Sequence, residues 1–133
     1  MTKMMEHSNL VLAKILDFAM ANGVSHWSLS FHELALDDTY ATHFYPCIEW
    51  LEAEGLIRVE HYSRVMGGIA NGSVDNISLT AKGMALLGQS VTVHGIQTSL
   101  SDTVKEVSSG RDFSKIGDLI GGIIAGFTKT IGS

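Results

Sequence analysis

Residues 44–57 of the chain read Phe44-Tyr45-Pro46-Cys47-Ile48-Glu49-Trp50-Leu51-Glu52-Ala53-Glu54-Gly55-Leu56-Ile57, a helix pattern followed at once by a strand pattern. Phe44, Ile48 and Leu51 recur at i, i+4 and i+7, which places them on one apolar face of an α-helix. Gly55 stands where a helix commonly ends in the left-handed conformation. We therefore expect a helix that ends at Gly55, with the rest of the chain packed around it.

Pro46 limits where this helix begins, because proline lacks the backbone N–H that a helix interior needs. Either the regular helix starts at Tyr45 or Pro46, or a distorted turn from about Thr39 leads into it. Both arrangements place Pro46 near the N-terminal end of the helix.

Three shorter patterns precede this helix. Residues 8–22 carry a broad apolar stripe, which predicts a first helix. Residues 26–31 alternate between apolar and polar side chains for a few positions, as a short edge strand does. Ser30 and Glu33 then have the spacing of a capping box, which predicts a second, short helix to about Leu36.

A β-hairpin and one more helix follow the opening stretch. We expect a strand at residues 57–62 to pair with residues 74–80 across the glycine-rich loop at 66–73. Thr80 can cap the next helix, at residues 81–87, with its side chain.

This order of elements is that of winged helix-turn-helix domains. Residues 44–57 resemble the recognition helix of PadR-type transcriptional regulators, in which a tyrosine-proline pair such as Tyr45-Pro46 precedes a leucine-rich helix with an acidic-Gly-Leu ending. The run Ile77-Ser78-Leu79-Thr80-Ala81-Lys82-Gly83 is similar to the Leu-Thr-x-x-Gly opening of the family's post-wing helix. The resemblance covers about residues 8–90. It implies a mainly α fold with a small antiparallel β-hairpin wing, in a winged-helix domain over residues 1–90.

The resemblance also implies that the recognition helix and the wing contact DNA. The candidate contact residues in this chain are Thr42, His43, Tyr45, Arg58, Arg64 and Lys82.

The charge distribution predicts that any DNA binding is weak. The net charge is −5, from nine Lys and Arg against fourteen Asp and Glu. Residues 91–133 are neutral, so the excess negative charge lies in residues 1–90, and residues 15–57 contain no Lys or Arg. Because proteins gain affinity for DNA by neutralising phosphates with basic side chains, this distribution weighs against tight binding.

Residues 91–133 are interpreted as a C-terminal amphipathic helical arm. Apolar residues follow a 3-4 spacing on both sides of a break at 108–110, which predicts two amphipathic helices. The second contains four glycines, each of which weakens a helix by up to ~1 kcal/mol, so it needs a partner surface. The family resemblance implies that this arm dimerises, and a membrane surface is the alternative. The predicted dimerisation residues are Val93, Ile96, Leu100, Val104, Val107, Phe113, Ile116, Ile120, Ile123 and Phe127.

The sequence predicts no catalytic residues, no metal site and no cofactor. His43 and Cys47 stand four positions apart, a spacing that can chelate zinc, but no further Cys or close His pair completes a tetrahedral site. Cys47 is the only cysteine and is interpreted as a small core residue. Trp27 and Trp50 are large enough to line a ligand pocket, although a place in the core is the simpler interpretation. The N-terminal segment lacks the apolar run of a signal peptide, so we expect a cytoplasmic protein.

These observations lead to one expected function with two alternatives. The first is a non-catalytic winged-helix protein resembling a transcriptional regulator, which works as a homodimer and binds DNA weakly. The second is a winged-helix module that has lost DNA binding and binds another protein. The third is a membrane-surface adaptor that uses the glycine-rich C-terminal helix.

Overall fold

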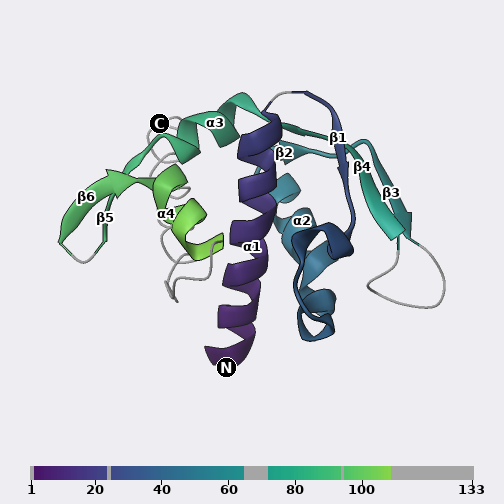
Figure 1. Ribbon diagram of the computed structural model, residues 1–133. Coiled ribbons are helices and arrows are strands. Elements are labelled where there is room, and N and C mark those ends of the chain that lie inside the picture. Colours follow the sequence, from purple (N-terminus) through teal and green to yellow (C-terminus); the bar gives the residue numbers. More distant parts are fainter. Residues whose placement is uncertain (1, 24, 65–71, 94, 109–133) are drawn as a thin grey trace.

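The structure is a computed structural model that describes residues 2–23, 25–64, 72–93 and 95–108. This part of the chain holds four α-helices, two 3₁₀ helices, a small antiparallel sheet and a separate β-hairpin (Figure 1). In chain order the elements are α1 (Thr2–Asn22), β1 (Trp27–Leu29), η1 (Phe31–Leu34), η2 (Asp38–His43), α2 (Phe44–Ala53), β2 (Ile57–Arg58), β3 (His61–Arg64), β4 (Gly72–Leu79), α3 (Ala81–Leu87), β5 (Ser90–Val93), β6 (Ile96–Ser99) and α4 (Leu100–Ser108).

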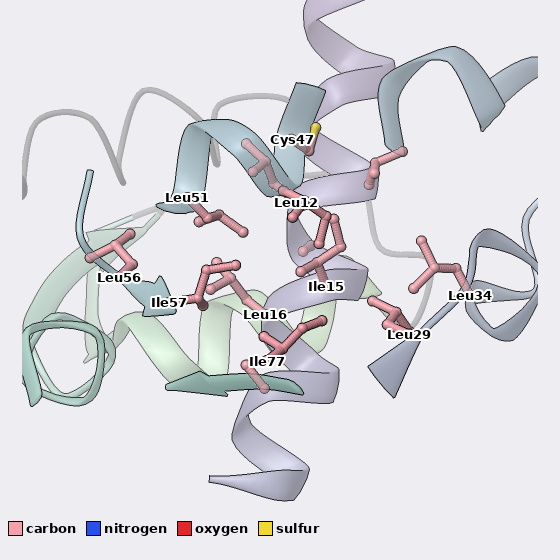
Figure 2. Close-up of a cluster of buried hydrophobic side chains, with 14 of the residues drawn as sticks. Leu12, Ile15, Leu16, Leu29, Leu34, Cys47, Leu51, Leu56, Ile57 and Ile77 are labelled. Atoms are coloured by element: carbon pink, nitrogen blue, oxygen red, sulfur yellow. The ribbon is translucent and has the colours of Figure 1, made fainter. Parts of the chain in front are cut away.

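Helix α1 runs through the middle of the molecule, with α2 packed on one side and α4 on the other (Figure 1). The sheet has the order β1-β4-β2, and β3 also pairs with β4, so β4 is the central strand. Side chains from α1, α2 and the sheet meet in one apolar core, part of which Figure 2 shows. Ile48 and Leu51, on the predicted apolar face of the helix, are confirmed as core residues with an exposed fraction of 0% each, and Leu79 of β4 joins them at 6%.

Helix α1 is longer than the sequence pattern predicts, because it begins at Thr2 and not near residue 8. The segment ahead of Ser8 contains Met, Lys and Glu, which favour helix, and has no Gly or Pro to interrupt it. The predicted C-terminal end is confirmed. Gly23 has a φ of 62°, and its N–H donates to the Ala19 carbonyl at 2.7 Å.

The predicted capping box at Ser30 and Glu33 is present, since the Ser30 N–H donates to Glu33 Oε2 at 2.7 Å. The helix that follows is a 3₁₀ turn and not an α-helix. It ends at Leu34, before Leu36, because Ala35 takes a left-handed φ of 57°.

Helix α2 follows directly on the 3₁₀ turn η2. Of the two predicted arrangements, the distorted turn that leads into the helix is therefore the one observed. Pro46 is the third residue of α2, where its missing N–H removes no intrahelical hydrogen bond.

The turn from α2 into β2 is built around Gly55, whose φ is 80° as the predicted helix ending requires. The Leu56 N–H bonds back to the Leu51 carbonyl at 2.9 Å. The start of α3 then packs on this turn. The Thr80 hydroxyl donates to the carbonyl oxygens of Gly55 at 2.6 Å and Leu56 at 3.0 Å. It also accepts the Gly83 N–H at 2.9 Å, which confirms Thr80 as the predicted cap of α3.

The predicted strand at residues 57–62 forms two short strands, both paired with β4 as expected. Ile57 lies opposite Leu79 in β2, while β3 pairs with the first half of β4. The break at residues 59–60 lies close to Asn76, which has a φ of 51°. Asn tolerates this left-handed conformation better than most residues do, and Asn76 lies between the part of β4 that pairs with β2 and the part that pairs with β3.

The prediction of a helix that begins near residue 93 is wrong for the first part of that segment. Residues 90–99 form the hairpin β5–β6, in which Val93 lies opposite Ile96 and Gly95 takes a φ of 77° in the turn. The hairpin is rich in β-branched residues, which favour strands, and their spacing also matches a helical repeat. Ile96 is 68% exposed on this hairpin.

Helix α4 packs against α1 of its own chain. Leu100, Val104 and Val107 are at most 4% exposed and belong to the same core as α1, and the Ser108 hydroxyl donates to Asp17 Oδ2 at 2.8 Å. The predicted boundary at residue 90, between the winged-helix domain and the C-terminal arm, therefore falls within a single apolar core. In this arrangement these three side chains do not form a free surface for a partner subunit. The other predicted dimerisation residues, from Phe113 to Phe127, lie outside the described residues.

Close packing at Gly83 gives the first testable prediction. A Cβ at this position would lie 2.3 Å from the Leu56 carbonyl oxygen, so Gly83→Ala must push α3 away from the α2–β2 turn. We expect Gly83→Ala to lower the free energy of unfolding by about 1–3 kcal/mol in urea titrations, although alanine favours helix over glycine.

Gly88 provides the matched control at the C-cap of α3. A Cβ there meets no atom closer than 3.6 Å, and its φ is −82°. Gly88→Ala should leave stability unchanged or raise it slightly. Equal effects of the two substitutions would contradict the packing of α3 on the turn.

Candidate interaction face around helix α2

One side of α2 is exposed and lacks basic side chains. Thr42, Pro46, Glu49 and Ala53 are exposed and spaced so that they fall on one side of η2 and α2. Trp50 beside them is half-buried. The surface that α2 presents to solvent is therefore short, partly apolar and acidic. We call these five residues the α2 face.

Tyr45, predicted to contact DNA, is a core residue. Its side chain is 6% exposed, and its ring packs edge-on against Phe44 with centroids 5.1 Å apart and beside Tyr62 at 6.4 Å. The reason is that α2 buries five of its ten residues, so its apolar face extends to Tyr45. Thr42 is exposed, and His43 is half-buried at the end of η2.

Two of the three predicted basic residues come together at the C-terminal end of α2. Arg58 is exposed on β2, and Lys82 is half-buried on α3 with its Nζ donating to the Glu54 carbonyl at 2.9 Å. Arg64 ends β3 opposite Gly72, and its side chain lies outside the described atoms.

Arg58 and Lys82 line an open groove of about 640 Å³. It lies where the end of α2, strand β2 and the start of α3 meet. Its walls include Glu52, Ile57, Arg58, Val59, Thr80 and Lys82. Both basic residues were candidates from the sequence, but their separation of 24 positions carries no local signal that they share a groove.

Glu52 is held in place on the wall of this groove. The Tyr62 hydroxyl donates to Glu52 Oε1 at 2.7 Å, which joins α2 to β3. A hydrogen bond to a charged acceptor is among the stronger kinds in proteins. The carboxylate is therefore oriented by the neighbouring strand.

A polar network that sequence analysis did not identify lies on the hairpin β3–β4. The hydroxyls of Ser63 and Ser73 donate to the two oxygens of Asp75, at 2.6 and 3.0 Å. These bonds, with that from Ser63 the larger influence, lower the pKa of Asp75 below its ordinary value. The only available signal was the alternation of Ser73 and Asp75 on one face of the strand.

Cys47 lies in the apolar core. Its side chain is 6% exposed, and burial raises the pKa of the thiol to about 12, so the reactive thiolate does not form near neutral pH. This confirms Cys47 as a core residue. Among the described residues no group of three or more His, Cys, Asp or Glu side chains is placed to hold a metal ion.

The two tryptophans are placed differently. Trp27 is 8% exposed within the core, and its Nε1 has no hydrogen-bond partner among the described atoms. Trp50 is half-buried beside the α2 face. Neither one lines the groove at Arg58 and Lys82.

Comparison of the chain with protein-family models, curated proteins and solved structures finds no match. None of the described helices has the length and apolarity needed to cross a lipid bilayer.

The Asp75 network predicts part of the chain's sensitivity to acid. Because the pKa of Asp75 is lower in the folded state, its contribution to stability is present above the unfolded value of about 3.9 and is lost as pH falls through the folded value. Asp75→Asn should therefore reduce the loss of stability on acidification from about pH 5, measured by urea titration at each pH.

An exposed aspartate outside the network, Asp38, provides the control. Asp38→Asn should keep the acid dependence of the unchanged chain. The proposed role of Asp75 would be wrong if Asp75→Asn and the unchanged chain lost the same stability over this pH range.

Proposed function

We propose that this chain is a non-catalytic winged-helix protein that works by binding another protein. In this proposal α2 takes the place of the recognition helix and the hairpin β3–β4 that of the wing. The order of elements and the central position of β4 in the sheet support the winged-helix assignment.

We infer a protein partner and not DNA from the composition of the α2 face. A recognition helix that enters the major groove needs Lys or Arg nearby to neutralise phosphates. The α2 face instead presents Glu49, and the same helix carries Glu52 in its last turn and Glu54 at its C-cap. Trp50, half-buried beside this face, is an aromatic side chain of the type enriched where protein partners bind.

A DNA-binding regulator is the second candidate, favoured by the positions of Arg58 and Lys82 on one groove. In a homodimer these residues and Arg64 would supply about six basic groups, enough for modest salt-sensitive binding if they converged. The homodimer itself stays a prediction, to be tested by light scattering on the full chain. The membrane-adaptor alternative depends on residues 113–127, which lie outside the described residues.

An anisotropy titration with labelled random-sequence duplex separates the two candidates. We expect a dissociation constant of about 100 μM or weaker at physiological salt, because the acidic side chains offset the few basic ones. Micromolar or tighter binding that disappears in both Arg58→Ala and Lys82→Ala would restore the DNA-binding regulator.

Site-specific photocrosslinking tests the protein-binding proposal directly. A benzophenone amino acid at Ala53, which is exposed on the α2 face, should give adducts of higher mass that nuclease leaves intact. The same group at Lys105, exposed on α4, is the matched control and should give no such adducts. Equal labelling at both positions, or adducts that nuclease removes, would contradict the proposal.

A further inference from the structure

The α2 face places short side chains between a carboxylate and an indole. Pro46 and Ala53 are exposed and lie two helical turns apart, so they fall on nearly the same line along α2. Successive residues of a helix are separated by about 100° around its axis. Glu49, which is exposed, therefore lies on one flank of this line, and the half-buried Trp50 lies on the other. A ligand on the α2 face meets a negative charge at one edge and an aromatic ring at the other.

Further negative charge lies on the same side of α1. The 3₁₀ turns η1 and η2, drawn in dark blue beside α2 and away from α4 in Figure 1, carry the exposed side chains Glu33, Asp37 and Asp38. Glu33 and Asp37 each accept a hydrogen bond from a backbone N–H, which has no net charge to offset the carboxylate. Residues 15–57 contain no Lys or Arg, so these elements supply no basic side chain of their own.

The carboxylates and the indole favour the same chemistry in a ligand. Exposed carboxylates attract cations and repel the phosphates of nucleic acids and anionic lipids. The face of an aromatic ring also attracts a cation. Arginine suits both groups best, because its guanidinium bonds a carboxylate through a planar fork and stacks on aromatic rings, whereas the lysine ammonium is a compact point charge.

The length of the α2 face favours a peptide segment over a small cation. The exposed positions run from Thr42 to Ala53, roughly 16 Å at the rise of an α-helix. Three turns of a helix cover that length, and a single arginine side chain does not. A segment with several arginines can therefore contact the carboxylate and the indole at once.

We propose that the α2 face binds an arginine-bearing segment of a partner protein. Arginine side chains of the segment bond to the Glu49 carboxylate and stack on the exposed part of Trp50. The carboxylates of η1 and η2 attract the segment as it approaches, which raises the rate of association. This inference rests on the proposed protein-binding function and names the partner's chemistry at that face.

The test uses the full chain and three rhodamine-labelled, twelve-residue peptides based on alanine. They carry arginine, lysine or glutamine at three positions spaced four apart. In anisotropy titrations at low salt the arginine peptide should bind roughly tenfold more tightly than the glutamine peptide and roughly threefold more tightly than the lysine peptide. Because exposed charges are screened by salt, the preference over glutamine should decrease at about 0.5 M salt.

Variants of the chain separate the two contacts. Glu49→Lys should reduce the preference for arginine over glutamine to roughly twofold or less. Glu106→Lys, exposed on α4, changes the net charge by the same amount and is the matched control, which should keep most of the preference. Trp50→Leu should bring the arginine and lysine peptides to equal affinity while both still bind more tightly than the glutamine peptide, a pattern that loss of folding could not produce.

Three outcomes would overturn the inference. Equal binding of the arginine and glutamine peptides, with crosslinking at Ala53 intact, would exclude an arginine-bearing partner and leave the protein-binding function standing. Equal losses in Glu49→Lys and Glu106→Lys would show that the net charge of the chain, and not the α2 face, attracts the peptide. A preference for arginine over lysine that survives Trp50→Leu would exclude the stacking contact.

Discussion

The geometry of the candidate site depends on how the start of α3 holds the turn at the end of α2. The last carbonyls of a helix have no donors within the helix and need partners elsewhere. In α2 the carbonyls of Leu51 and Glu52 accept the N–H groups of Leu56 and Gly55, within the turn. The carbonyls of the turn itself are bound from the start of α3: Thr80 donates to those of Gly55 and Leu56, and Lys82 donates to that of Glu54. Gly83 allows the two backbones to approach closely enough for these bonds to form. The same contact fixes the direction in which β2 leaves the turn, and so the position of the groove.

Features decided by neighbouring residues could be predicted from the sequence. Gly55 and Thr80 were assigned correctly because each position follows from the hydrogen-bonding needs of a nearby helix end. The hairpin β5–β6 was missed because its β-branched residues fit a helical spacing as well as a strand. Gly95, which has a positive φ, was the residue that favoured a turn. Periodicity alone cannot separate the two over so short a segment.

The candidate site was less accessible to sequence reasoning than the fold. The apolar face of α2 could be predicted from the spacing of its residues. How far that face extends around the helix depends on the neighbouring elements, and their packing buries Tyr45. The convergence of Arg58 and Lys82 depends on two turns of the chain, and the Asp75 network depends on strand register. Total charge gave the expected sign of the surface but not the groove where Arg58 and Lys82 come together.

The contact between α1 and α4 also affects how the chain folds during synthesis. The hydrogen bond from Ser108 to Asp17 joins residues 91 positions apart, and the apolar residues between these helices belong to one core. The helix made first therefore keeps part of its apolar face uncovered until the last described helix has left the ribosome. Contacts over such long separations slow folding and expose apolar surface to other proteins in the meantime. A nascent chain stalled before residue 100 would thus carry an unfinished core and become a substrate for chaperones.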